Sequence, residues 1–325
     1  MSLGVDAAVD GILARDRGVL ARAITLIEST REEDRVRAEA VIAKLLPKTG
    51  SALRVGLSGV PGAGKSTFIE TLGTSLIEAG KTVAVLAVDP SSTSTGGSIL
   101  GDKTRMPRLA VDPRAFVRPS PAGGELGGVA RRTREAMLLC EAFGFDVVIV
   151  ETVGVGQSES AVADMVDTFV LVALPGAGDE LQGIKRGVME LVDIVAVNKA
   201  DGDNIARARR SERDVRAALH YQRRRFRSWE PRVLSVSALE GKGISEVWAS
   251  VEEHRAALEA SGELLALRKA QLRRWLWSLL QEGLVAALRA SPKVNARLSA
   301  LEIAVEAGEV SPPAAARELL LAFGR

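Results

Sequence analysis

The sequence has very little cysteine and histidine. Among its 325 residues, one is a cysteine, Cys140, and two are histidines, His220 and His254. A single cysteine excludes an internal disulfide, and a reducing compartment is the simplest environment for such a chain, so we expect the cytoplasm. Two isolated histidines without neighbouring cysteines do not make a soft-metal ligand set, so neither is expected to bind a metal.

A charge imbalance and long apolar runs are also missing. The chain has 43 Lys and Arg residues against 41 Asp and Glu residues, a net charge of +2. This balance gives no general reason to expect nucleic acid or an anionic membrane as a partner. No apolar run approaches the roughly 18 residues of a membrane span. The start, Met1 to Asp6, lacks the basic and apolar regions of a signal peptide, and no transit peptide is visible, so we expect a soluble protein that is not exported.

The clearest positive feature is a glycine-rich stretch between a short apolar run at 53–58 and a helical pattern at 66–79. It fits G-x-x-x-x-G-K-[ST], the phosphate-binding loop, and consists of Gly59, Val60, Pro61, Gly62, Ala63, Gly64, Lys65, Ser66 and Thr67. The glycines let backbone N–H groups turn toward phosphate oxygens, and the following helix directs its positive end at the same anion. We expect Lys65 to reach the β- and γ-phosphates and the Ser66 hydroxyl to ligate Mg²⁺.

Carboxylates follow two further apolar runs. The run at 81–88 ends in Asp89, and the polar loop at 90–105 contains Asp102. Such a loop is either a disordered connection or a switch ordered by the γ-phosphate and Mg²⁺, and its position favours the switch. The run at 145–150 ends in Glu151, which has D/E-x-x-G spacing to Gly154. We expect Asp89, Asp102 and Glu151, with Ser66, to hold or orient Mg²⁺ and its waters.

The residue that positions the attacking water is not obvious. Many GTPases have a glutamine directly after the glycine of this motif, but here Val155 follows Gly154, and Gln157 comes two places later. The loop at 175–185, which ends in Lys185, is either a second mobile element or an ordinary glycine-rich cap. We therefore name Lys65, Glu151, Gln157 and Lys185 as the candidate catalytic residues, and we expect slow hydrolysis that a partner accelerates.

A base-recognition motif follows downstream. An expected strand at 191–197 leads into Asn198, Lys199 and Asp201, which fit N-K-x-D. The Asp201 carboxylate can accept from both the ring N–H and the exocyclic amine of guanine, and adenine offers no matching pair of donors. Lys199 can lie along the base plane. A later strand at 233–236 leads into Ser237, Ala238 and Leu239, whose backbone can contact the guanine oxygen. The four motifs in this order predict a guanine nucleotide site.

These patterns predict an α/β fold, with a P-loop GTPase domain at 51–261 whose mostly parallel central sheet is covered by helices. A helical extension is expected at 1–50 and a helical arm at 262–325. The long apolar face of the arm must be buried on its own domain or on another chain, and we favour self-association. The basic run 223–227 beside Trp229 reads as a solvated loop with the indole packed on the domain, rather than as a contact for RNA or an acidic protein.

The motif set resembles the MeaB/ArgK-type GTPases of the metallochaperone-type group, the bacterial counterparts of the methylmalonic aciduria type A protein. The resemblance rests on E-T-V-G-V-G-Q at 151–157 and on segments 88–92, 101–106 and 178–185, and it covers nearly the whole chain. It implies a homodimer joined through the C-terminal arm that binds GTP or GDP with Mg²⁺. It also implies a chaperone that gates cofactor loading and protects adenosylcobalamin-dependent methylmalonyl-CoA mutase.

Two other functions fit parts of the pattern. A GTPase that inserts nickel belongs to the same group, but such proteins use Cys and His ligands that this chain does not offer. A small-molecule kinase acting on an amino acid would need an acceptor pocket, and it has no use for strict guanine recognition. A metal titration and the fate of the transferred phosphate separate these alternatives from a GTPase chaperone.

Overall fold

The computed structural model describes residues 3–88, 105–119, 126–152, 158–176 and 186–324. The chain forms two compact units, Met1–Arg268 and Lys269–Arg325. The first unit contains a β-sheet with helices on both faces, and the described part of the second unit is helical.

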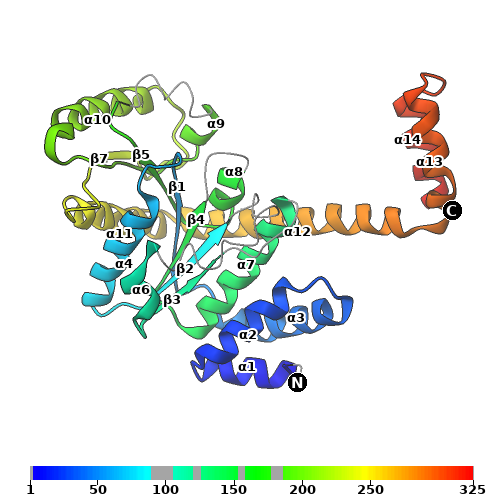
Figure 1. Cartoon of the computed structure of the whole chain (residues 1–325), viewed down its shortest axis with the longest axis horizontal. Coiled ribbons are helices and arrows are strands. Elements are labelled where there is room, and N and C mark those ends of the chain that lie inside the picture. Colours follow the sequence, from blue (N-terminus) through cyan, green and yellow to red (C-terminus); the bar gives the residue numbers. More distant parts are fainter. Residues whose placement is uncertain (1–2, 89–104, 120–125, 153–157, 177–185, 325) are drawn as a thin grey trace. The chain divides into compact units, whose positions relative to one another are not determined.

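The sheet places the ends of its strands along one edge. Seven strands occur among the described residues, all neighbouring pairs are parallel, and the order is β3-β2-β4-β1-β5-β6-β7 (Figure 1). The strands are β1 (Leu53–Ser58), β2 (Val83–Val88), β3 (Ala115–Arg118), β4 (Val147–Thr152), β5 (Thr168–Ala173), β6 (Ile194–Val197) and β7 (Arg232–Ser235). The predicted α/β fold with a mostly parallel, helix-covered sheet is confirmed.

Helices connect the strands and extend the chain at both ends. Those of the first unit are α1 (Val5–Leu13), α2 (Arg17–Glu28), α3 (Glu32–Leu45), α4 (Lys65–Glu78), α6 (Pro107–Val111), α7 (Leu126–Phe143), α8 (Ser158–Ala163), α9 (Arg186–Met189), α10 (Ile205–His220) and α11 (Ile244–Ser261). Short 3₁₀ turns are η1 (Leu46–Lys48) and η3 (Gly202–Asn204). Helix α12 (Glu263–Ala290) begins in the first unit, and α13 (Pro292–Glu306) and α14 (Pro312–Phe323) follow in the second.

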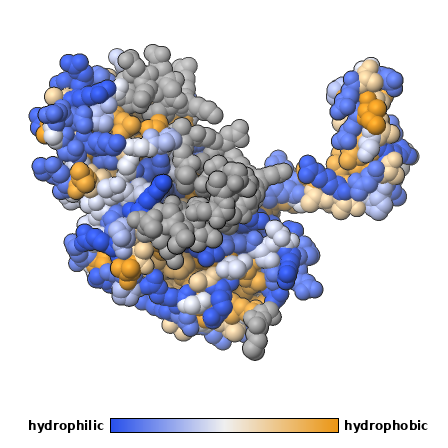
Figure 2. All heavy atoms as spheres, in the orientation of Figure 1, coloured by the Kyte–Doolittle hydropathy of each residue, from blue (hydrophilic) through white to orange (hydrophobic). Residues whose placement is uncertain are grey.

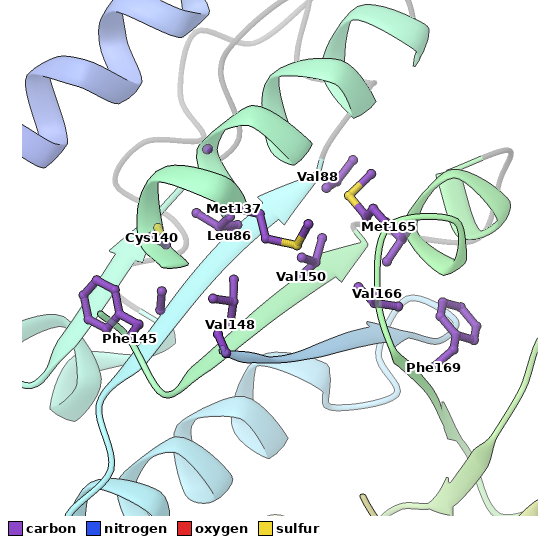
Figure 3. Packing of buried hydrophobic residues seen from close by; sticks show 14 of the residues in the cluster. Leu86, Val88, Met137, Cys140, Phe145, Val148, Val150, Met165, Val166 and Phe169 are labelled. Carbon is purple, nitrogen blue, oxygen red and sulfur yellow. The ribbon is translucent and has the colours of Figure 1, made fainter. Parts of the chain in front are cut away.

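Successive residues of each central strand enter two different cores, because side chains alternate between the faces of a sheet. In β4, Val148 and Val150 join the core under α7, and Val147 and Ile149 join the core under α4. Figure 3 shows Val148 and Val150 beside Met137 of α7. Burial on both faces explains why the strands read as continuous apolar runs.

The N-terminal helices α1 to α3 pack against one another, and α2 and α3 pack against the outer surface of α7. Ile12, Leu20 and Ile24 are fully buried and belong to the same core as Val148 and Val150. The helical extension therefore thickens one side of the sheet, through α7.

The start of β6 is set by a buried carboxylate. Asp193 is 1% exposed; it accepts from the Phe169 N–H at 2.8 Å and pairs with the Arg225 guanidinium at 2.9 Å. Burial raises the pKa of Asp193 to about 6. The expected start of this strand at Leu191 is wrong: Leu191 N–H donates to Val188 in a turn, and β6 begins at Ile194.

The aromatic side chain of the basic run packs on the domain, as predicted. Trp229 is 6% exposed, and its Nε1–H donates to the Asp193 carbonyl at 3.0 Å. The edge of the Trp229 ring faces the buried His254, with 5.0 Å between ring centroids. Burial lowers the pKa of His254 to about 3, so this imidazole is neutral at physiological pH.

A second buried carboxylate ties several segments together. The Asp167 side chain is fully buried and accepts from Arg255 at 3.2 Å and from two nitrogens of Arg268 at 2.9 and 2.8 Å. The Arg268 guanidinium also donates to the carbonyls of Gly50 and Ala52, at 2.5 and 3.1 Å. One guanidinium thus fixes the first turns of α12 and the chain segment that enters β1.

No helix of the described segments combines the length and the apolar character of a membrane-spanning segment.

Candidate functional site

The glycines of the phosphate loop sit where other residues would not fit. Gly62 and Gly64 have φ values of +80° and +88°, in the left-handed region that side chains with a Cβ avoid. A Cβ on Gly59 would lie 2.3 Å from the Val172 carbonyl oxygen of β5. The loop thus needs glycine at these positions, and helix α4 begins directly after it at Lys65. This is the strand, loop and helix context that the motif requires.

Lys65 lies inside the loop that precedes it. The residue is 8% exposed, and its Nζ donates to the carbonyls of Gly59 at 2.8 Å and Val60 at 3.3 Å. Burial lowers the pKa of Lys65, and the carboxylates of Glu151 and Glu159 act in the opposite direction. A phosphate bound beside this ammonium group would supply negative charge and stabilise the protonated form of the buried lysine. The site therefore favours an anionic ligand.

Ser66, in the first turn of α4, lies close to Glu151 of β4. Strands β1 and β4 pair with Leu57 opposite Glu151, and the Ser66 Oγ lies 3.4 Å from a Glu151 carboxylate oxygen. Hydroxyl and carboxylate oxygens are hard donors of the kind that Mg²⁺ prefers, so this pair fits a magnesium ion beside bound phosphates. Within the described segments, no group of three or more His, Cys, Asp or Glu side chains forms a metal cluster.

Several predicted residues lie outside the described part of the chain. They are Asp89 and Asp102 of the expected magnesium ligands and the catalytic candidates Gln157 and Lys185. Asp89 follows directly on Val88, the last residue of β2, which neighbours β4 in the sheet. Among the predicted magnesium and catalytic residues that the structure describes, Lys65, Ser66 and Glu151 lie close together.

Asn198 connects the phosphate loop to the base-recognition segment. Its amide nitrogen donates to the Ala63 carbonyl at 2.8 Å, and its amide oxygen accepts from the Ala238 N–H at 2.9 Å. Asn198 is 2% exposed, and a Cβ on Gly64 would lie 2.5 Å from its Nδ2. This bridging role was not predicted from the sequence; the position of Asn198 at a strand end was the only signal for it.

The remaining base-recognition residues gather beside Asn198. The Ser237 hydroxyl donates to one Asp201 carboxylate oxygen at 2.5 Å, and the carboxylate keeps lone pairs on both oxygens for two donors of a ligand. Lys199 has a φ of +59° and an exposed side chain, so the chain turns sharply after the strand. Leu239 is 81% exposed next to the buried Ala238. The segments after β6 and β7 thus present a carboxylate, an exposed cation and backbone groups at one edge of the sheet.

Comparison with known proteins decides the family. Residues 20–293 match the family described as Methylmalonyl Co-A mutase-associated GTPase MeaB. The chain belongs to the MeaB GTPase family. Among its relatives, the GTPase ArgK of Escherichia coli is 47% identical, with 94% of this chain and 92% of ArgK covered. The mouse protein named methylmalonic aciduria type A homolog, mitochondrial, is 48% identical over 98% of this chain and 79% of its own length.

A solved structure agrees with this assignment to the MeaB family. The crystal structure named LAO/AO transport system kinase is 39% identical, has a TM-score of 0.80, and is matched over 98% of its chain and 99% of this one. Together these matches confirm the predicted MeaB/ArgK-type resemblance and the prediction of a GTP hydrolase.

Proposed function

We propose that this MeaB-family GTPase acts as a chaperone of adenosylcobalamin-dependent methylmalonyl-CoA mutase, gating cofactor loading and protecting the enzyme from inactivation. The observation that carries the proposal is the match of residues 20–293 to a family named for its association with that mutase. The relative named methylmalonic aciduria type A homolog is consistent with it. The buried, unpaired Cys140 is consistent with a reducing cytoplasm.

In this proposal the nucleotide is GTP or GDP, and the base is selected by Asp201 and by the backbone of 237–239. Asp201 accepts from the two guanine donors, and Lys199 lies along the base plane. Asn198 holds the base-recognition segment against Ala63, so the phosphate loop and the base pocket keep a fixed spacing. The bridge supports one rigid site for the whole nucleotide.

Hydrolysis in this proposal depends on charge neutralisation and on a positioned water. Lys65 and the amides of residues 59–67 neutralise the charge that develops on the transferred phosphoryl group. Ser66 and Glu151 would hold a magnesium ion, with Asp89 and Asp102 as further direct or water-mediated ligands, and the ion would supply positive charge near the phosphates. Gln157 and Lys185 are proposed from the sequence to complete the catalytic site when a partner is bound.

We propose that the arm, 262–325, joins two copies of the chain. Large apolar side chains of α12 are exposed, namely Leu272, Leu276, Trp277, Leu280 and Leu284. An exposed apolar stripe of this length favours burial against a second copy. Light scattering that gave only the mass of one chain, 34.4 kDa, would rule out this arrangement.

The test of the proposed function is GTP turnover with and without the purified mutase. Because no glutamine directly follows Gly154, turnover of the chain alone should be slow, and the mutase should raise it at least about tenfold by completing the catalytic site. Phosphate release is the measurement, and an unrelated enzyme of similar size is the control.

Unchanged turnover in the presence of the mutase would reject this partner. The same assay tests a kinase, the activity named for the solved structure of the 39% identical relative. Phosphate found on an added amino acid rather than in solution would favour that second function.

A further inference from the structure

A pocket at the end of α10 is not used by the proposed function. It encloses about 480 Å³, and its charged and aromatic lining comes from Arg213, Arg216, His220, Tyr221, Arg224 and Glu230. Helix α10 starts after the base-recognition segment, and the pocket lies toward the other end of the helix, beside Pro231, which directly precedes β7. In a parallel sheet this is the amino edge of the strands, so the pocket is separate from the nucleotide site.

The pocket continues a stripe of positive charge along α10. The stripe consists of the exposed residues Arg209, Arg213 and Arg216, whose spacing of four and three residues places them on one face of the helix. The opposite face, with Ala208, Val215 and Leu219, is buried against the sheet. Figure 2 shows hydrophilic residues gathered over α10 in the upper left of the view. The stripe therefore faces solvent and ends at the pocket.

Most of the acidic groups near the pocket are already paired. Glu230 pairs with Arg224 at 3.0 Å, and Glu212 pairs with Arg216 at 2.6 Å. Arg213 has no acidic partner among the described residues. These pairs hold two guanidinium groups in place and leave a surplus of positive charge at Arg213 and along the stripe.

Tyr221 provides an apolar anchor at the same place. It is the only tyrosine of the chain, it is 89% exposed, and its ring stands edge-on to the His220 ring at 5.8 Å between centroids. Tyr and Arg are the residues that protein interfaces favour, because both bury large areas and form hydrogen bonds. An exposed tyrosine surrounded by exposed guanidiniums is thus the composition expected of a surface that binds a protein segment.

We propose that this pocket and the α10 stripe bind an acidic segment of a partner protein. Carboxylates of the segment would pair with Arg213 and the neighbouring arginines, and an apolar residue between them would cover Tyr221. The complementarity of charge supports this occupant, because the surplus on this face is positive although the chain as a whole is nearly neutral. The proposal does not depend on which protein the GTPase assists.

The test uses the full chain with GDP and magnesium present, so that the nucleotide site is filled. The probe is a fluorescein-labelled peptide rich in Glu with one central Leu, and binding is followed by fluorescence anisotropy. The peptide should bind, added salt should weaken it, and the counterpart with Lys in place of Glu should not bind. The double variant Arg213→Glu, Tyr221→Ser should bind the acidic peptide at least about tenfold more weakly, with unchanged GTP turnover.

Arg22→Glu is the matched control, because it makes the same change of charge at an exposed position of α2. It should bind the peptide like the unaltered protein. Equal weakening by Arg22→Glu would mean that only overall charge matters, and would overturn the proposal. So would tight binding by the double variant, the absence of peptide binding to the unaltered protein, or displacement of the peptide by ATP or inorganic phosphate.

Discussion

Replacing Lys65 by alanine is expected to abolish GTP hydrolysis, lowering turnover by at least about a hundredfold. The Lys65 ammonium is the buried cation of the phosphate loop, and its nitrogen lies 2.8 Å from the Gly59 carbonyl oxygen. The phosphate oxygens of a bound nucleotide would lie within this loop. The charge of Lys65 would be needed most as negative charge grows on the transferred phosphoryl group. The measurement is phosphate release at saturating GTP.

The control for this variant is Lys48→Ala. Lys48 is an exposed lysine of η1 outside the site, so its removal should leave turnover unchanged. Thermal unfolding without nucleotide should change little in Lys65→Ala, since burial of the charged lysine is unfavourable and lowers its pKa. Turnover within twofold of the unaltered protein in a folded Lys65→Ala variant would show that this loop is not the catalytic centre.

The second large effect concerns stability. Asp167→Ala is expected to lower the free energy of unfolding of the first unit by about 3–5 kcal/mol, because the largely buried Arg268 guanidinium loses its carboxylate and Arg255 loses its buried one. The side chains of Arg255 and Arg268 are 17% and 16% exposed, so water compensates little for the loss. The measurement is urea unfolding followed by tryptophan fluorescence.

Glu259→Ala is the matched control, because Glu259 also pairs with Arg255 but is 52% exposed. This variant should lower the free energy of unfolding by at most about 1 kcal/mol, which is what a surface ion pair contributes. Equal and small losses in both variants would contradict the view that Asp167 ties the first turns of α12 to the entry of β1.

The features that could be predicted from the sequence depend on local chemistry. The phosphate loop was predicted because Gly62 and Gly64 are needed for their own backbone angles, whatever surrounds them. The strands were predicted because burial on both faces makes each one a short apolar run, although the exact start of β6 was not. That start depends on Asp193, whose partners Phe169 and Arg225 are far away in sequence.

The features that could not be predicted depend on contacts between distant segments. Asn198 reaches Ala63 across 135 positions of the chain, and Arg268 reaches Gly50 across 218. Nothing in the local pattern of either residue indicates its partner. The pocket at the end of α10 likewise forms from two segments, around Arg213 and around Glu230, that fold against each other.

We propose that one rigid site recognises guanine and the triphosphate together. Calorimetric titration with GTP, GDP and ATP in the presence of magnesium tests it most directly, with Asp201→Asn measured beside the unaltered protein. We expect GTP and GDP to bind, with at least about a hundredfold preference over ATP. Asp201→Asn should reduce this preference, because the guanine donors lose their acceptor. No heat with GTP or GDP, or equal affinity for GTP and ATP, would contradict it.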